Sequence, residues 1–149
     1  MEFQEALKQS CLSAHLKSET KDAIIEEMID MLDAAGRLPD RDAALAAVFE
    51  RESKMSTGMQ YGVAIPHGKS DSVEALVAAV ALKPEGVDFA ALDGAPSQIF
   101  VMTVSPVADT GPHIQYLSEI SKLLNQPVLR QSLLEAKTEA DMRDVLMGT

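Results

Sequence analysis

The pattern of apolar positions predicts a short strand and then a helix at the start of the chain. The strand is expected over residues 11–16. Ser18 is a suitable N-cap, so the helix is predicted to begin there and to run to about Ala35. Gly36 then stands where glycine commonly ends a helix. The apolar stripe of this helix consists of Ile25, Met28, Ile29 and Leu32.

A second stretch of helical spacing follows Pro39. Asp40 or Asp42 is expected to cap this helix, because an aspartate side chain accepts hydrogen bonds from the free N–H groups of a first turn. The helix is predicted to close near Arg51, and a loop leads from there to Gly58. Its inward-facing apolar residues are expected to be Leu45, Val48 and Phe49.

The middle of the chain has the composition of strands. Residues 63–66 form one candidate, and Pro66 is expected to end it because proline cannot donate to a central ladder. Residues 75–82 are apolar at every position, which suits a strand covered by helices on both faces, although their alanine content also suits a helix. A turn at Asp93–Gly94 between two strand-like segments predicts an antiparallel hairpin. These segments are residues 89–92 and 98–104.

The last third of the chain is predicted to be helical. Pro112 suits the first turn of a helix, and apolar residues follow it at core spacing. Asn125 is expected to end that helix, and Pro127 to start another. Thr138 with Asp141 can cap the last one. The core positions expected on the first and last of these helices are Ile114, Leu117, Ile120, Ser121, Leu124, Met142, Val145 and Leu146.

These elements predict a single α/β domain that spans residues 1–149. Its sheet is expected to be mixed and mostly parallel with one antiparallel hairpin, and helices are expected to pack on both faces. The sequence shows no linker, repeat or low-complexity tract. A length of 149 residues is enough for one sizeable core.

Composition narrows the class of protein. Hydrophobic residues make up 46% and charged residues 24%, which is ordinary for a soluble globular protein. The longest apolar run, residues 75–82, is far shorter than the roughly 20 residues that span a bilayer, so membrane insertion is not expected. The first five residues lack the basic start and apolar stretch of a signal peptide. Cys11 is the only cysteine, which excludes an intrachain disulfide. These features predict a cytoplasmic protein.

The charge balance argues against nucleic acid as a partner. Affinity for phosphate backbones depends on lysine and arginine, and here 13 basic residues face 23 acidic ones, for a net charge of −10. The lysine and arginine residues form no cluster in the sequence that would give a locally basic surface. An acidic surface can steer a basic partner protein, but charge alone does not name one.

The segment Gly62–Lys69 carries the strongest chemical signal. It consists of a short apolar strand, a proline, and then His67 beside Gly68. Histidine can act as a base, a nucleophile or a metal ligand near neutral pH. Gly68 is expected to let the chain bend away without shielding the imidazole. A single histidine is nevertheless more often structural than functional, so the surrounding residues decide its interpretation.

Four features together resemble one known family. They are Arg51, the run Ser56–Gly58, the Gly-Val-Ala-Ile-Pro-His-Gly segment and His113 near the start of a predicted helix. This combination resembles the type 2 enzyme IIA domain of the bacterial phosphoenolpyruvate-dependent phosphotransferase system, which has fructose, mannitol and nitrogen-regulatory branches. The resemblance runs from about Cys11 to about Leu146 and implies an α/β fold of the kind predicted above.

The resemblance implies that His67 accepts a phosphoryl group from a phosphohistidine on the small carrier protein HPr. His67 would then pass this group to a IIB domain, or hold it as a signal for a regulatory target protein. Neutral imidazole is a good nucleophile, and the resulting phosphoramidate bond stays labile. Such a relay depends mainly on positioning and charge stabilisation, and it needs no cofactor beyond the covalent phosphohistidine.

The resemblance gives Arg51 and His113 supporting roles beside His67. The planar guanidinium of Arg51 can bind two phosphoryl oxygens at once and stays charged. His113 corresponds to the second histidine of the family, and near a helix start it can donate to phosphate. Each also has an ordinary structural interpretation, as a solvated arginine at a helix end and as a partly buried histidine bonded to a carbonyl. Arg51→Ala is expected to slow phosphorylation and to leave the fold intact.

A short turn before the histidine segment is a weaker candidate for phosphate binding. Ser56, Thr57 and Gly58 can offer hydroxyl and backbone N–H donors, or they can be no more than a turn. Gln60 departs from the family pattern, because many members have a small residue there. Its side chain is expected to narrow the approach to His67.

Two functions of other classes stay open. The chain can be a regulatory binding module, in which a transporter, kinase or transcription factor reads the phosphorylation state of His67, as in the nitrogen-regulatory branch. Alternatively, His67 and His113 can form a metal site with Asp71 or Asp109. No close-spaced ligand motif supports the second alternative, so no metal is expected.

Overall fold

The computed structural model describes residues 3–108 and 110–148, which fold into six helices and five strands. In chain order these elements are α1 (Phe3–Gln9), β1 (Cys11–Ser13), α2 (Lys21–Ala34), α3 (Arg41–Lys54), β2 (Val63–Ala64), β3 (His67–Lys69), β4 (Val77–Val87), β5 (Ser97–Ser105), α4 (Thr110–Leu124), α5 (Pro127–Leu134) and α6 (Glu139–Met147).

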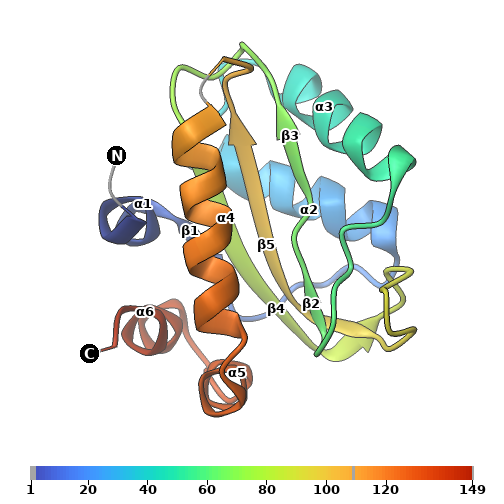
Figure 1. Cartoon of the computed structure of the whole chain (residues 1–149), viewed down its shortest axis with the longest axis vertical. Helices are drawn as coiled ribbons and strands as arrows, with labels where there is room; N and C mark the ends of the chain where they lie inside the picture. The colour runs from blue at the N-terminus through green and yellow to red at the C-terminus, as the bar shows by residue number, and fades with distance from the viewer. Residues whose placement is uncertain (1–2, 109, 149) are drawn as a thin grey trace.

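The strands form one mixed sheet in the order β1-β4-β5-β2, with β3 also paired to β5. The pairs β1–β4, β2–β5 and β3–β5 are parallel, whereas β4 and β5 are antiparallel. Figure 1 shows β2 and β3 following one another along the same side of β5. The predicted α/β fold with a mostly parallel sheet and one hairpin is therefore confirmed.

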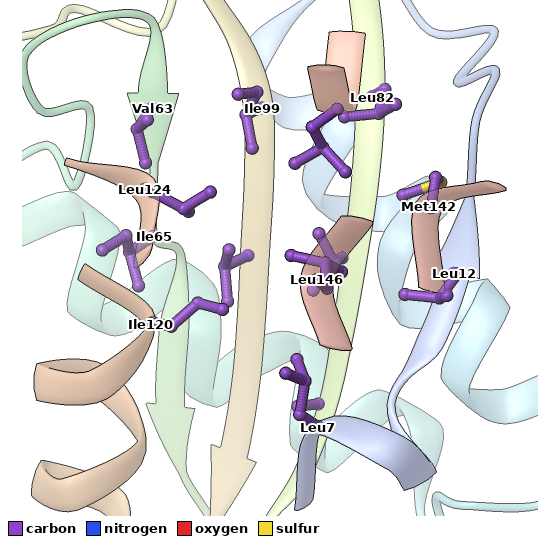
Figure 2. Packing of buried hydrophobic residues seen from close by; sticks show 14 of the residues in the cluster. Leu7, Leu12, Val63, Ile65, Leu82, Ile99, Ile120, Leu124, Met142 and Leu146 are labelled. Atoms are coloured by element: carbon purple, nitrogen blue, oxygen red, sulfur yellow. The ribbon is translucent and has the colours of Figure 1, made fainter. Parts of the chain in front are cut away.

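Helices cover both faces of this sheet (Figure 1). One core cluster joins the sheet to α1, α4, α5 and α6, and the other joins it to α2 and α3. Alternate residues of β4 enter opposite clusters: Val80 and Leu82 enter the first, whereas Ala79 and Ala81 enter the second. The apolar run at 75–82 is thus mainly a strand buried on both faces, as a sheet between two helical layers requires. Figure 2 shows part of the first cluster.

Helix caps follow the sequence with one exception. Asp40 caps α3 by accepting from the Ala43 N–H, and Thr138 caps α6 by accepting from the Asp141 N–H. Gly36 follows α2 with a φ of 74°, which only glycine adopts at little cost. The expectation of Ser18 as the cap of α2 was wrong: Thr20 accepts from the Ala23 N–H. Both candidates are hydroxyl residues two positions apart, so composition could not separate them.

The predicted hairpin exists, but its first strand is not residues 89–92. The long strand β4 itself returns into β5, and its partner residues run from Val77 opposite Val104 to Val87 opposite Ser97. Residues 88–96 connect them, with the Gly94 N–H donating to the Ala91 carbonyl in the predicted turn. Phe89 is buried in the second core cluster, so its apolar character reflects packing of a loop residue. Helix α1 was not expected from the sequence.

The strand predicted over 63–66 ends at Ala64, and pairing resumes at His67 rather than stopping. Ile65 and Pro66 lie between β2 and β3, where Pro66 interrupts the edge of the sheet. Gly68 therefore lies within a strand and does not bend the chain away. A Cβ atom on Gly68 would lie 2.7 Å from the Val48 nitrogen, so glycine lets α3 pack directly on β3.

Candidate functional site

A cavity of about 310 Å³ lies at the edge of the sheet, between α3 and the start of α4. Its walls bring together three residues that the sequence singled out from separate segments: Arg51, His67 and His113. The cavity is bordered by more positive than negative side chains, which suits an anion. Its lining consists of Ala47, Glu50, Arg51, Lys54, His67, Gly68, Lys69 and His113.

The imidazole of His67 is fixed at one nitrogen and open at the other. Its Nδ1 lies 2.8 Å from the carbonyl oxygen of Ile65. Because a carbonyl can only accept, Nδ1 carries the proton of the neutral ring and Nε2 carries the lone pair. Within residues 3–108 and 110–148, no hydrogen bond engages Nε2. The side chain thus presents a free nucleophilic nitrogen.

The surroundings also keep His67 neutral. Burial lowers the pKa of His67 below its ordinary value of 6.5, and the positive charges of Arg51 and Lys69 lower it further. The Ile65 carbonyl and the carboxylate of Glu52 act in the opposite direction but do not offset these effects. A lowered pKa means that the unprotonated, nucleophilic form dominates near neutral pH.

His113 lies in the first turn of α4, buried beside His67. The centroids of the two rings are 5.3 Å apart, with their planes at 59°. Nε2 of His113 lies 3.1 Å from the hydroxyl oxygen of Thr103 in β5. Burial lowers the pKa of His113 to about 4, helped by the proximity of His67 and Lys69. The ring is therefore neutral at physiological pH.

Arg51 occupies the last turn of α3 and borders the same cavity. Its Nη1 donates to the carbonyl oxygen of Met55 at 2.9 Å, which leaves the rest of the guanidinium available. Lys54 and Lys69 add positive charge to the cavity. This arrangement can hold a doubly charged oxyanion next to His67.

The turn Ser56–Gly58 does not line this cavity. The hydroxyl of Ser56 donates to the Phe89 carbonyl at 2.5 Å and accepts from the Gly58 N–H at 3.0 Å. Thr57 donates through both its backbone N–H and its hydroxyl to the carboxylate of Glu52. The donors that the sequence suggested for phosphate are therefore committed to partners inside the protein.

Sequence reasoning missed two groups next to the site. One is the backbone carbonyl of Ile65, which holds His67, and the other is Glu52, a residue that is only 6% exposed. Hydrophobic periodicity gives no signal for a backbone acceptor. Glu52 follows Arg51 in a helix rich in charged residues, where an acidic side chain normally faces solvent.

A second cavity of about 320 Å³ lies farther along the same edge, beside β2 and the C-terminal end of α4. Gln60 lines this second cavity and not the one at His67, so the sequence difference there falls outside the histidine site. The second cavity is mainly apolar. Its lining consists of Met59, Gln60, Tyr61, Val63, Ile65, Leu92, Ser121, Leu124 and Asn125.

The described residues contain no candidate for the alternative of a metal site. No group of three or more histidine, cysteine, aspartate or glutamate side chains that could hold a metal ion occurs among them. Asp109, one of the ligands considered, lies outside the described residues. None of the helices in the described ranges combines the length and apolar character needed to cross a bilayer.

Comparison with known proteins agrees with the geometry. Residues 5–148 match the family model described as phosphoenolpyruvate-dependent sugar phosphotransferase system, EIIA 2. The chain is 42% identical over 127 residues to the PTS system fructose-specific EIIA component of Haloferax volcanii, and this match covers 85% of this chain and 82% of the relative.

Two solved structures share the fold. The nitrogen regulatory protein IIA-Ntr from Neisseria meningitidis aligns with a TM-score of 0.85 and 28% identity, over 96% of this chain and 97% of that one. The Escherichia coli enzyme IIA for mannitol, solved in complex with phosphorylated enzyme IIB, aligns with a TM-score of 0.79 and 19% identity, over 93% and 94%. With a match along nearly its whole length, the chain belongs to the EIIA 2 family of the phosphoenolpyruvate-dependent sugar phosphotransferase system.

Proposed function

We propose that this chain is a phosphocarrier that accepts a phosphoryl group on Nε2 of His67 from phosphorylated HPr. One observation carries the proposal: the Ile65 carbonyl engages Nδ1 of His67, and Nε2 is free in a cavity that Arg51 also borders. Membership of the EIIA 2 family makes phosphoryl transfer the expected chemistry. The geometry supports His67 as the residue that performs it.

The proposed step exchanges one phosphorus–nitrogen bond for another. The lone pair of Nε2 attacks the phosphorus atom of the donor phosphohistidine in line with the bond that breaks. The electron pair of that bond returns to the donor imidazole. His67 keeps its Nδ1 proton, and the Ile65 carbonyl stabilises the positive charge that develops on the ring. No water or external base is needed.

The neighbouring charges stabilise the transferring group. Arg51 is proposed to bind two phosphoryl oxygens through the guanidinium nitrogens that Met55 does not engage. Lys54 and Lys69 add longer-range positive potential within the same cavity. His113 lines the cavity next to the ring of His67. We propose that its imidazole donates a hydrogen bond to a phosphoryl oxygen.

The Ser56–Gly58 turn is proposed to support the site from behind rather than to bind phosphate, since its donors are already engaged. The covalent phosphohistidine is the only prosthetic chemistry proposed, and neither a cofactor nor a metal takes part. The proposed setting is the cytoplasm, with HPr as donor.

A IIB domain is the acceptor we propose for sugar uptake. The Escherichia coli mannitol protein with the same fold was solved together with phosphorylated IIB, and the Haloferax relative is fructose-specific. A regulatory role, in which a target protein reads the phosphorylation state, is the second candidate. It is favoured by the nitrogen regulatory protein from Neisseria, whose TM-score with this chain is 0.85.

The test is incubation with phosphoenolpyruvate, enzyme I and HPr, followed by intact mass spectrometry. Wild type is expected to gain one acid-labile phosphoryl group and His67→Ala none. His15→Ala is the matched control, because His15 is an exposed histidine bonded to the Lys137 carbonyl, away from the cavity. Phosphorylation of folded His67→Ala would contradict the proposal. Adding a IIB domain then separates the two roles: loss of the label indicates transport, and a stable label indicates signalling.

A further inference from the structure

A buried carboxylate behind the cavity has no part in the proposed transfer and needs another explanation. Glu52 lies in α3, with its side chain 4% exposed. Its carboxylate accepts from Lys21 Nζ at 2.8 Å, from the Thr57 N–H at 2.7 Å and from the Thr57 hydroxyl at 2.6 Å. Burial raises the pKa of Glu52, but these hydrogen bonds more than offset that effect and keep it ionised.

Stability alone is a poor reason for such a group. Removing two charges from water costs about as much as their attraction returns, and apolar residues of the same volume are often as stable. A buried carboxylate with all its hydrogen bonds made does, however, fix the positions and orientations of the groups that donate to it. In this protein both backbone and side chain of Thr57 are fixed in this way.

The segment that begins at Thr57 runs antiparallel to the residues just before His67. The Ile65 N–H donates to the Thr57 carbonyl at 3.0 Å, and the Met59 N–H donates to the Val63 carbonyl at 2.7 Å. A β-bridge joins Gly58 to Ala64 between these two bonds. Thr57 therefore anchors a short extended segment that holds Ile65 in place.

Two carbonyls close to this anchor accept hydrogen bonds from residues of the site. Ile65, whose N–H is bound to Thr57, uses its own carbonyl to accept from Nδ1 of His67 at 2.8 Å. Met55, two residues before Thr57, uses its carbonyl to accept from Nη1 of Arg51 at 2.9 Å. One buried carboxylate is thus connected to both groups proposed to meet the phosphoryl: to His67 through the hydrogen bond between Thr57 and Ile65, and to Arg51 through the two peptide units between Thr57 and Met55.

We propose that Glu52, paired with Lys21, is a positioning residue that fixes the tautomer of His67 and the direction of Arg51 through Thr57. This inference rests on the proposed function of His67. If the anchor is loosened, the Ile65 carbonyl no longer selects the Nδ1–H tautomer, and Nε2 is unprotonated for only part of the time. The maximal transfer rate then falls, whereas the affinity for the donor protein, which the anchor does not touch, is retained.

The test compares variants of Thr57 that keep or remove one bond to Glu52. Thr57→Val removes the hydroxyl at nearly constant volume, and Thr57→Ser restores it. The matched control is Ser10→Ala, which also removes a buried hydroxyl; that of Ser10 donates to the Ala6 carbonyl and is hydrogen-bonded to the Tyr116 hydroxyl. Lys21→Gln loosens the same carboxylate from its partly exposed end and serves as a second variant if Thr57→Val does not fold.

Two readouts are measured on each folded variant. The first is the rate of His67 phosphorylation at several concentrations of phosphorylated HPr, and the second is the pair of imidazole ¹⁵N chemical shifts of His67. Thr57→Val is expected to lower the maximal rate about tenfold with less than about a twofold change in the half-saturating donor concentration. Its two ¹⁵N signals are expected to move toward each other as the tautomers mix. Thr57→Ser and Ser10→Ala are expected to match wild type in both readouts.

Equal maximal rates in Thr57→Val and Ser10→Ala would overturn the proposal, and so would unchanged ¹⁵N shifts in both Thr57→Val and Lys21→Gln. The shifts do not depend on any phosphoryl transfer. If wild-type His67 takes no phosphoryl group, the proposed function fails, while the shifts still decide whether Glu52 orients His67.

Discussion

The centre and the edge of the sheet are built from similar apolar residues but differ in continuity. At the centre, β4 and β5 pair in antiparallel register from Val77 to Leu82, and the pairing is taken up again at Val87. At the edge, β2 and β3 contribute two and three residues to the side of β5, with Ile65 and Pro66 between them. The cavity proposed for function lies at the interrupted edge, between α3 and the start of α4.

The position at the edge of the sheet explains why. In a continuous ladder each backbone carbonyl is committed to a neighbouring strand. At the edge, the Pro66 carbonyl accepts from the Thr103 N–H of β5, whereas the Ile65 N–H donates away from β5 to the Thr57 carbonyl. The Ile65 carbonyl therefore has no partner in β5 and can accept from His67. The centre stabilises the fold through continuous burial of side chains. The edge provides the Ile65 carbonyl, which orients His67, and leaves Nε2 of the His67 ring accessible. This difference can be tested by changes that affect one region and not the other.

The largest effect is expected from removing an isoleucine side chain at the centre. Ile99 in β5 is 1% exposed, whereas Ile65 at the edge is 9% exposed and lines the second cavity. Both belong to the same core cluster (Figure 2). Ile99→Ala is expected to lower the free energy of unfolding by about 3–4 kcal/mol and Ile65→Ala by about 2 kcal/mol, because Ile65 already borders a cavity and its truncation leaves less new enclosed space than truncation at the centre. Urea unfolding measures both, and equal losses would contradict the comparison.

The second-largest expected effect is the dependence of the free energy of unfolding on pH that arises from buried His113. Its pKa in the folded protein is about 4, below the ordinary 6.5, so the unfolded chain binds a proton first as the pH falls. Stability is therefore expected to decrease from pH 6.5 toward pH 4, by about 2–3 kcal/mol from this group. His113→Gln is expected to reduce this slope in unfolding curves, and His15→Gln, at an exposed site, to leave it unchanged. Equal slopes in all three proteins would exclude His113 as the cause.

A third prediction separates chemistry at the edge from stability. Arg51→Ala is expected to slow phosphorylation of His67 by about tenfold to a hundredfold, which corresponds to about 1.4–2.7 kcal/mol of barrier, because it removes the paired donors that we propose for the phosphoryl oxygens. Lys122→Ala, an exposed basic residue of α4 paired with Glu119, is the control for loss of one positive charge. Both variants are expected to melt close to the wild-type temperature. A normal rate in Arg51→Ala would remove Arg51 from the site.

The smallest effect tests how closely α3 approaches the edge strand. A Cβ on Gly68 would lie 2.7 Å from the Val48 nitrogen and 2.8 Å from the Ala47 carbonyl carbon. Gly68→Ala is therefore expected to cost about 1–2 kcal/mol, since backbone must move to accept it. The control is Gly111→Ala in α4, where a Cβ atom would meet nothing within 4 Å. Both substitutions lower the conformational entropy of the unfolded chain equally, so Gly111→Ala is expected to leave the free energy of unfolding unchanged or to raise it slightly. Thermal unfolding of the two variants gives the comparison, and equal melting temperatures would refute the close packing.

The sequence predicted the centre of the sheet better than the edge. The apolar run 75–82 identified the core of β4, and the Asp93–Gly94 turn identified the hairpin, although its first strand was placed too late. The prediction of a strand over residues 89–92 was wrong because an apolar loop residue such as Phe89 packs into the core as a strand residue does. At the edge, the sequence predicted that the strand ends at Pro66. It does not show that the residues before Pro66 and those after it both pair with β5.

For the site, the sequence by itself determined which residues are candidates for the chemistry. The short strand, proline and glycine around His67 are features of the local sequence, whereas the roles expected of Arg51 and His113 came from the family resemblance. The structure brings all three residues to one cavity. Only the tertiary structure decided which nitrogen is free, which side chains are buried and which donors are already used. Those properties depend on contacts between residues separated along the chain, such as Lys21 with Glu52 and Thr103 with His113. Periodicity reports the face on which a residue lies, but a backbone carbonyl such as that of Ile65 leaves no trace in the sequence.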